Sequence, residues 1–450
     1  MTQLTIQIHH GGCWHDAAVL DIKIPDRGIA SACTLDYETD YFIENGSGEL
    51  AAGQAVRDWR ALSVATPIDL EFRRFSNWPP FLLDLLPQGH ARRRLATELG
   101  FGNADDPAVE YPLLLRGGGC PIGNLRIKEA WKAEQERVAT EVVRSGPCPG
   151  VTTDDIMTLN DAFRLVAERF ALVASGSSGV QGEWPKILMT RSSTDDLWYP
   201  DPIIPDSEAA AHVIVKLSRG KYREDMLILE SEAPYLEVAR RFGLRVGAPL
   251  AYSPNVLLIP RFDRVAEGGH VVRLGQESLV SAIGVAEFGY RGSHEAYLEV
   301  IKRETTKPKA EIVEYVLRDL LNFAMGNPDN HGRNTALQKR ADGTVSLTPL
   351  FDFAPMRLDP SAITRSTRWA CMGGPDVQPN WAAICAVAVG DFMDADELQH
   401  ELLSRLDMLR ALPDIARAAG VPDEAVMVAC RRHDDMAERV AAMRMSAHGH

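Results

Sequence analysis

The stretch G-N-P-D-N-H-G-R-N-T, Gly326 to Thr335, lies between an apolar helix-like run and the strand-like segment S-L-T-P-L-F-D-F. It places Asp329 five residues before Asn334, and Asp352 follows about twenty residues later, where the pattern predicts the end of an apolar strand. Each piece has a plain structural explanation, because N-P-D-N-H-G has the composition of a tight turn and a buried Asp can cap a backbone amide. The three side chains together call for a chemical explanation.

Phosphoryl transfer is a chemistry that uses all three. It requires a carboxylate that orients the attacking hydroxyl, an Asn that binds magnesium, and a second carboxylate for the metal that bridges the ATP phosphates. Asp329 and Asn334 have the offset of the Asp and Asn in a protein-kinase catalytic loop, and Asp352 follows where the metal-binding Asp is expected. His331 could position this loop or take part in proton transfer.

Further kinase elements occur upstream in the expected order. Lys216 lies in the alternating strand V-I-V-K, and we expect Glu232 to begin the next helix, so that the two could pair while Lys216 contacts phosphates. A surface ion pair would give the same pattern. Before them, small residues at 175–182 could wrap phosphates with backbone amides, and Lys186 follows. The candidates in this loop are Ser177, Ser178, Gly179 and Val180.

The strand N-V-L-L-I-P-R-F is the expected connection between two lobes. Backbone groups near Pro260 and Phe262 could read the edge of an adenine there. The neighbouring Arg261, Asp263 and Arg264 could serve function or form a structural ion-pair network, and the sequence leaves both open.

Composition limits the partners. The chain has 450 residues, 45% of them hydrophobic and 24% charged, which is enough for two or three domains or lobes. The formal charge of −14 disfavours broad nucleic-acid binding, although a local basic patch could exist. No signal peptide or membrane span is evident, so we expect the cytoplasm, and the seven cysteines show no C-x-x-C pair.

Short strands and turns dominate the chain to about residue 127, and amphipathic helices dominate after residue 276. We therefore expect a smaller β-rich lobe joined to a larger helical lobe. The first part also contains a basic helix start at Arg92, Arg93 and Arg94, which we expect on a solvated face.

At these residues the sequence resembles the HipA family, bacterial serine/threonine protein kinases that act as toxins of toxin-antitoxin modules. The resemblance covers most of the chain. It rests on L-L-P-Q-G-H-A-R, S-G-V-Q, I-P-R-F-D-R, R-L-G-Q-E-S-L-V-S-A-I-G, N-P-D-N-H-G-R-N and L-T-P-L-F-D-F. It implies an α+β, two-lobed kinase-like fold: a β-rich subdomain at 1–130, an N-lobe with the phosphate loop at 131–260, and a helical C-lobe at 261–450.

The resemblance also implies roles and partners. Asp329 would be the catalytic base, Asn334 and Asp352 would hold Mg²⁺, and Lys216 would contact ATP. In some members the protein substrate is an aminoacyl-tRNA synthetase, and a small DNA-binding antitoxin restrains the kinase.

The chain departs from the family pattern in three places. The insertion G-E-W-P precedes Lys186, Gly176 stands where the family has an autophosphorylated serine, and Gln88 replaces a glutamate. These departures leave two alternatives to a serine/threonine protein kinase acting on a host protein. One is a small-metabolite kinase of the same fold, and the other is a nucleotide-binding regulator that has lost catalysis.

Overall fold

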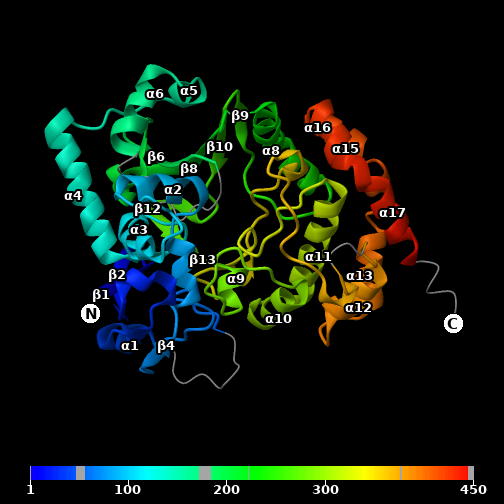
Figure 1. Cartoon of the computed structure of the whole chain (residues 1–450), viewed down its shortest axis with the longest axis horizontal. Helices are drawn as coiled ribbons and strands as arrows, with labels where there is room; N and C mark the ends of the chain where they lie inside the picture. The colour runs from blue at the N-terminus through cyan, green and yellow to red at the C-terminus, as the bar shows by residue number, and fades with distance from the viewer. Residues whose placement is uncertain (1, 47–55, 172–183, 221, 375–377, 444–450) are drawn as a thin grey trace.

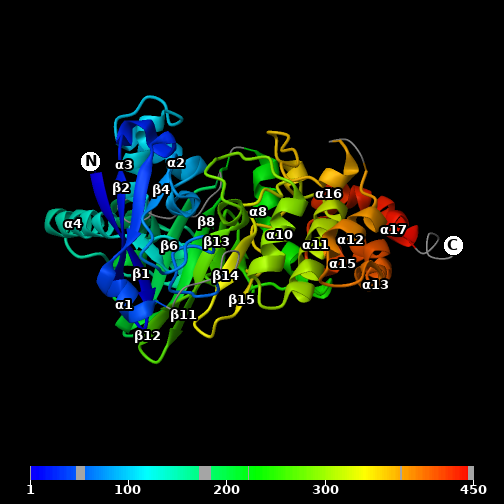
Figure 2. The same cartoon turned by 90° about the horizontal axis from the view of Figure 1, so that it is seen from below.

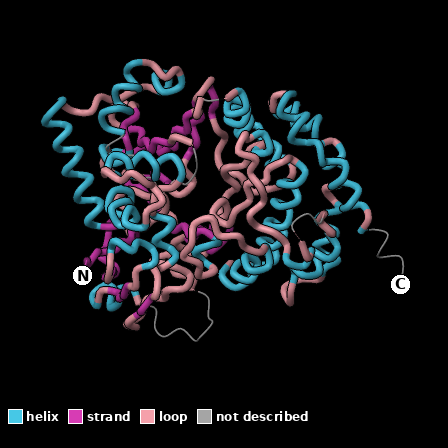
Figure 3. The backbone as a smooth tube through the Cα atoms, viewed as in Figure 1, coloured by secondary structure: helices cyan, strands magenta, loops and turns pink. Residues whose placement is uncertain are grey.

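The computed structural model describes residues 2–46, 56–171, 184–220, 222–374 and 378–443. Figure 1 shows strands and short helices of the N-terminal part on one side and the helices of the C-terminal part on the other. Figure 2, the view from below, shows the same separation along the long axis, and Figure 3 shows that the strands concentrate in one half. The predicted α+β architecture, with a β-rich N-terminal region and a helical C-terminal region, is confirmed.

The N-terminal region is an antiparallel sheet with the strand order β4-β3-β2-β1-β5. Alternate apolar residues of β1, among them Leu4, Ile6 and Ile8, are buried in a core that also contains Trp78 and Leu82. The strands are β1 Thr2–His10, β2 Cys13–Ile22, β3 Cys33–Tyr37, β4 Arg73–Phe75 and β5 Leu125–Ile127. The helices around them are α1 Thr39–Asn45, the 3-10 helix η2 Pro80–Leu85, α2 Gly89–Glu98, α3 Glu110–Gly117 and α4 Lys128–Ser145.

A second antiparallel sheet, with the order β7-β6-β8-β10-β9, has different partners on its two faces. Val213 and Val215 of β8 join Phe163 in one cluster, whereas Leu257 of β10 packs with Ile228 on the opposite side. The strands are β6 Lys186–Ser192, β7 Trp198–Pro200, β8 Ala209–Leu217, β9 Ala251–Ser253 and β10 Val256–Pro260. The helices are α5 Thr153–Met157, α6 Asp161–Val166 and α8 Arg223–Arg241. Because side chains alternate along β8, Lys216 projects from the face opposite Val213 and Val215, which is the face that α8 covers.

The helix that carries Glu232 begins earlier than the sequence predicts. It starts at Arg223, where Asp225 accepts a hydrogen bond from the Tyr222 amide, and it continues through Pro234. Glu232 therefore lies in the middle of α8 and not at its start, so the backbone on both sides holds it in place. The Arg92 expectation is also wrong: its side chain is buried and pairs with Glu110 at 3.3 Å.

The C-terminal region combines two small sheets with a helical core. The strands are β11 Arg264–Glu267 and β12 His270–Arg273 in one sheet, and β13 Gly275–Ser278, β14 Ala336–Lys339 and β15 Val345–Leu347 in the other. The predicted strand to Phe353 instead ends at Leu347. Pro349 has no N–H to donate, and Asp352 has a left-handed φ of 51°, so the chain leaves the sheet before the aspartate.

The helical core surrounds α11, whose buried residues include Val316, Leu320 and Leu321. At its C-terminal end Gly326 has φ 62°, and a Cβ there would lie 2.7 Å from the Ala429 carbonyl, so the turn into the quoted stretch requires glycine. The helices are α9 Leu279–Ala282, α10 His294–Glu304, α11 Pro308–Ala324, α12 Trp381–Val389, α13 Ala395–Leu403, α14 Leu406–Arg410, α15 Leu412–Ala419, α16 Asp423–Ala429 and α17 His433–Ala441. Within the described ranges, no helix is long and apolar enough to span a bilayer.

Candidate active site

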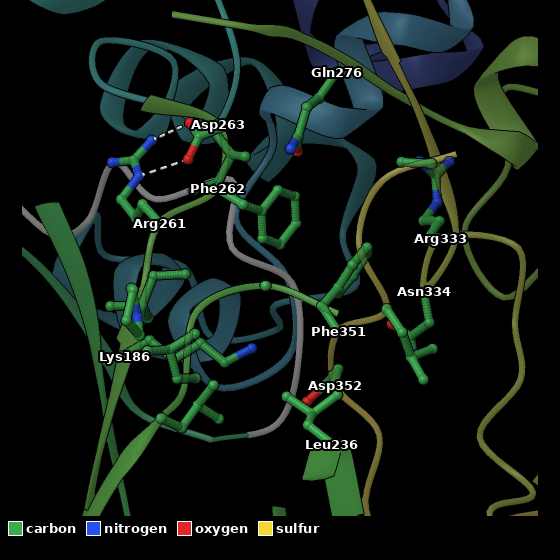
Figure 4. A pocket seen from close by; sticks show the side chains of 18 of the residues that line it. Lys186, Leu236, Arg261, Phe262, Asp263, Gln276, Arg333, Asn334, Phe351 and Asp352 are labelled. Atoms are coloured by element: carbon green, nitrogen blue, oxygen red, sulfur yellow. Dashed lines mark hydrogen bonds and ion pairs between the residues drawn. The ribbon is translucent and has the colours of Figure 1, made fainter. Parts of the chain in front are cut away.

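Six of the candidate residues line a cleft between the second sheet and the stretch 326–335 (Figure 4), and Lys216, Asp329 and His331 are not part of its lining. Its apolar wall comes from both regions, and its polar groups come from separate loops and strands. The apolar lining includes Ile214, Leu236, Leu250, Ile259, Leu350 and Phe351. The predicted residues in the lining are Lys186, Glu232, Pro260, Phe262, Asn334 and Asp352. An apolar pocket with few convergent polar groups is the usual form of a small-molecule site.

Lys216 connects two carboxylates that are far apart in the sequence. Its Nζ lies 2.6 Å from Glu232 Oε2 on α8 and 2.9 Å from Asp352 Oδ1. The side chains of Lys216 and Glu232 are each only 2% exposed. Burial alone would lower the pKa of Lys216, but Asp352 and Glu232 raise it well above its usual value. Lys216 is therefore held as a cation beside Glu232 and Asp352, which line the cleft.

A second cation, Lys186, lies opposite Lys216 in the register of β6 and β8. Directly opposite residues of antiparallel strands share a face, and Lys186 lines the cleft. Burial lowers the pKa of Lys186; Asp352 counteracts this shift, and Lys216 adds to it. The loop candidates Ser177, Ser178, Gly179 and Val180 lie outside the described residues.

The loop after Gly326 places Asp329, His331 and Asn334 side by side. The Asn334 side-chain amide donates to the Asp329 carbonyl at 3.0 Å, and the Asn334 backbone amide donates to the His331 carbonyl at 2.9 Å. His331 Nε2 lies 3.6 Å from Asp329 Oδ1, and the Asp329 side chain is 25% exposed. The loop is thus closed by hydrogen bonds to its own backbone carbonyls, and His331 is the side chain beside the Asp329 carboxylate.

The environments of Asp329 and Asp352 move their pKa values in opposite directions. Burial raises the pKa of Asp329; His331 counteracts this shift, and the Asp352 carboxylate adds to it. Burial would raise the pKa of Asp352 as well, but Lys216 and Lys186 hold it well below its usual range. Paired carboxylates with divergent pKa values are typical of sites where one acts as a base and the other stays charged.

Asp352 has another unusual feature, since its φ of 51° lies in the left-handed region. A non-glycine residue there carries backbone strain of the order of 1 kcal/mol, and such residues concentrate at functional sites. The same residue makes the bond to Lys216.

The expected connection between lobes lies in the cleft wall, but several of its backbone groups already have partners. The Arg261 amide donates to the His212 carbonyl at 3.0 Å, and the Phe262 carbonyl accepts from Gln338 at 3.3 Å. The Phe262 ring packs against Phe351 with centroids 5.7 Å apart. The aromatic surface and the Pro260 carbonyl are therefore the groups that a flat ligand would meet first.

The geometry of Arg261, Asp263 and Arg264 bears on whether they serve function or form a structural ion-pair network. Arg261 bonds both oxygens of Asp263 at 2.5 and 2.9 Å and reaches Asp201 at 3.2 Å, while Arg264 bonds Asp201 at 2.7 Å. Asp263 also accepts from the Gly123 amide at 2.9 Å, which ties the N-terminal region to this strand. The carboxylates and guanidinium groups satisfy one another, and this favours the structural reading.

Sequence reasoning missed two residues that line the cleft, Asp84 and Arg333, and one residue beside Lys216, Trp184. Asp84 of η2 accepts a 2.6 Å hydrogen bond from Arg333 in the stretch 326–335, and both line the cleft, so the N-terminal region contributes to it. Trp184, from the inserted G-E-W-P, is 5% exposed, and its ring lies 5.4 Å from Lys216 Nζ. In the sequence, only the insertion G-E-W-P could have drawn attention to Trp184. No sequence pattern near Asp84 or Arg333 predicts that the two side chains pair.

Comparisons with known proteins match this chain over most of its length. The family model described as HipA-like C-terminal domain matches residues 178–419. Two proteins of Sinorhizobium fredii, both provisionally designated kinases, are similar in sequence. Y4mE is 26% identical over 290 residues, which cover 61% of this chain and 63% of that protein, less than two thirds of its length. Y4dM is 24% identical over 356 residues, which cover 74% and 76%.

A solved structure matches the fold. A chain in the complex of the Shewanella oneidensis MR-1 toxin-antitoxin system HipA, HipB and operator DNA superposes with a TM-score of 0.60 at 15% identity. The superposition covers 98% of this chain and 97% of that chain. The two-lobed architecture behind a β-rich N-terminal region is therefore shared over nearly the whole length.

Proposed function

The chain belongs to the family of the HipA-like C-terminal domain, and we propose that it is a Mg²⁺- and ATP-dependent serine/threonine protein kinase that transfers the γ-phosphoryl group to a host protein. The observation that carries the proposal is Lys216, bonded to Glu232 at 2.6 Å and to Asp352 at 2.9 Å. In protein kinases the strand lysine, its helix glutamate and the metal-binding aspartate must be in place together. Three distant segments converge here to make that arrangement.

The donor set fits a magnesium ion. Mg²⁺ prefers oxygen ligands, and Asn334 uses its side-chain NH₂ on the Asp329 carbonyl, which leaves its Oδ1 available. Asp352 supplies a carboxylate that stays ionised. Among the described residues no group of three or more His, Cys, Asp or Glu could hold a metal by itself. Water and nucleotide phosphates would therefore complete the coordination, as is usual for Mg²⁺.

The charged candidate residues in and beside the cleft have distinct roles in the proposed reaction. When bound, Mg-ATP supplies the transferable phosphoryl group and neutralises the charge that develops on it. Asp329 accepts the hydrogen bond of the substrate hydroxyl, orients it and takes its proton, and its raised pKa makes it a better base. Lys216 and Lys186 place positive charge where phosphates would lie, and Glu232 fixes Lys216. His331 positions the loop.

The partners follow from the family and remain proposals. The solved relative is a toxin-antitoxin system with HipB and operator DNA. By analogy, we extend the proposal to a DNA-binding antitoxin that restrains this chain and to a protein substrate that could be an aminoacyl-tRNA synthetase. Such a kinase would act in the cytoplasm.

Radiolabelled ATP and Mg²⁺ added to a host extract test the activity and its target together. The wild type should label a discrete polypeptide, which mass spectrometry then identifies, and Asp329→Ala should label none while it remains folded. Equal labelling by both proteins would contradict the role of Asp329. If ATP is consumed only when a metabolite mixture is present, the small-metabolite kinase replaces the protein kinase. Tight nucleotide binding with no turnover would indicate a regulator.

A further inference from the structure

A second cavity, of about 310 Å³, lies beside the catalytic loop and is strongly basic. Four arginines line it, Arg357, Arg365, Arg368 and Arg432, and none of its described lining residues is acidic. This contrasts with the chain as a whole, whose formal charge is −14. The cavity is therefore a local positive site on an acidic protein.

Both walls of this cavity are bonded to the catalytic loop on either side of Asp329. The Arg357 amide donates to the Gly326 carbonyl at 3.0 Å. On the other side, the Asn330 side-chain amide donates to the Thr367 carbonyl at 3.1 Å. Asn327 and Pro328 line the cavity, whereas Asn334 at the end of the loop lines the nucleotide cleft. The loop thus separates the two spaces, with Asp329 between them.

Two of the four arginines of this cavity are not neutralised by a carboxylate among the described residues. Arg365 pairs with Asp319, which is 3% exposed. Arg357 and Arg432, in contrast, have no carboxylate partner among the described residues. Burial lowers the pKa of Arg357, and the charges of Arg432 and Arg431 lower it further. Partly buried like charges without an acid destabilise the fold, so their presence calls for an anionic ligand.

We propose that this cavity binds a carboxylate-rich segment of the protein substrate, a few residues from the hydroxyl that Asp329 orients. The proposal rests on the proposed kinase function, which it deepens by naming the substrate class. Arginine forks bind carboxylates with two parallel hydrogen bonds, and an extended peptide advances about 3.3 Å per residue, so a neighbouring acidic side chain reaches a site beside the catalytic loop. The substrate serine or threonine would therefore lie in an acidic sequence.

Three synthetic peptides test the site, each with a central serine flanked on both sides by Glu, Gln or Lys. Fluorescence anisotropy with Asp329→Asn measures binding without phosphoryl transfer. We expect the Glu peptide to bind at least about tenfold more tightly than the Gln peptide, and the Lys peptide to bind least. Arg357→Gln and Arg432→Gln should each remove most of this preference. Arg432→Gln should fold normally, because Arg432 makes no ion pair with the part of the chain that the structure describes.

Arg431→Gln is the matched control, since Arg431 is exposed, carries the same charge and does not line the cavity. It should keep the preference for the Glu peptide. Equal affinity for the Glu and Gln peptides, or an equal loss in Arg431→Gln and Arg432→Gln, would overturn the proposal. Tighter, arginine-dependent binding of an RNA oligomer than of the Glu peptide would overturn it in favour of nucleic acid.

Phosphorylation of the peptides by the wild type is measured in a separate experiment. If the wild type phosphorylates the Glu peptide with the lowest KM, and Arg432→Gln raises that KM more than it lowers kcat, both proposals are supported. If the Glu peptide binds through the arginines but no peptide or host protein is phosphorylated, the binding site stands and the kinase function fails.

Discussion

Two buried ionic clusters contact the same strand, β8, and differ in charge balance and in access to solvent. The first, the Lys216 cluster, consists of Lys216, Glu232 and Asp352. The second, the Arg261 cluster, consists of Arg261, Arg264, Asp201 and Asp263, beside His212 on β8. The Arg261 cluster pairs two arginines with two aspartates, all at most 4% exposed. It is neutral and its charges are paired, although Arg261 and Asp263 also form part of the wall of the cleft.

The Lys216 cluster is not neutral. With Lys186 and Asp329 it makes a group of two lysines and three carboxylates in and beside the cleft, and the Asp352 side chain is 26% exposed. The group therefore has a net negative charge that a divalent cation could balance. The Arg261 cluster is already neutral and would gain nothing from a cation. Burial of charge alone therefore does not mark an active site; incomplete compensation at the wall of a cavity does.

The largest expected effect is that of Lys216→Met, which removes one partner from the Lys216 cluster. It should lower the free energy of unfolding by roughly 3–5 kcal/mol, because Glu232 is left buried and unpaired, and it should abolish phosphotransfer. The double variant Lys216→Met with Glu232→Gln should regain stability in urea unfolding but no activity. If the double variant phosphorylated protein, Lys216 would be structural only.

Removing first one and then both partners of an ion pair in the Arg261 cluster should change the free energy of unfolding but not nucleotide binding. Arg261→Met should cost about 3 kcal/mol, and Arg261→Met with Asp263→Asn should recover much of it. Nucleotide affinity of the double variant, measured by calorimetry on folded protein, should stay within about twofold of wild type. If the double variant lost nucleotide binding without being destabilised, the Arg261 cluster would belong to the nucleotide site and would not differ in function from the Lys216 cluster.

A smaller effect is expected for Asp352→Asn, which keeps the shape and removes one charge. Mg-nucleotide affinity should fall at least about tenfold, since even residues that only support metal ligands have effects of this size. Calorimetry with and without Mg²⁺ distinguishes metal binding from nucleotide packing. Asp391→Asn, an exposed aspartate in the C-terminal region, is the control. Unchanged affinity in Asp352→Asn would exclude it as a metal ligand.

The smallest effects are pH-dependent. Because the pKa of Asp329 is higher in the folded than in the unfolded chain, its ionisation destabilises the fold above the folded pKa, and this penalty vanishes below the unfolded pKa. Asp329→Asn should therefore have a higher Tm than wild type at pH 7, and the difference should shrink on acidification. A Tm difference that grew with acid would contradict the raised pKa.

The ionisation of Asp263 should affect stability in the opposite direction to that of Asp329. Burial opposes ionisation, but Arg261 lowers the pKa of Asp263 to about 2. Its stabilisation is present above the unfolded pKa of about 4 and is lost as the pH falls towards 2. Arg261→Met with Asp263→Asn should therefore lose less stability than wild type between pH 4 and pH 2 in thermal scans. An equal loss in both proteins would show that Asp263 is not held ionised.

The sequence by itself determined the features that depend on local spacing. The α+β class, the alternating strand with Lys216 and the family resemblance around Asp329 and Asn334 could all be read from periodicity and motifs. It misplaced the start of α8 and extended a strand to Phe353, because capping geometry and the left-handed φ of Asp352 decide those boundaries. Short patterns do not encode such local conformations.

Only the tertiary structure decided which charges compensate one another. Arg333 bonds Asp84 from the N-terminal region, and Arg261 neutralises Asp201 and Asp263, whereas Arg357 and Arg432 meet in a cavity beside the catalytic loop. The Arg333–Asp84 pair joins residues 249 positions apart in the sequence. The physical reason is that the energy of an ionic group depends on burial and on neighbours brought by folding, which sequence spacing does not contain.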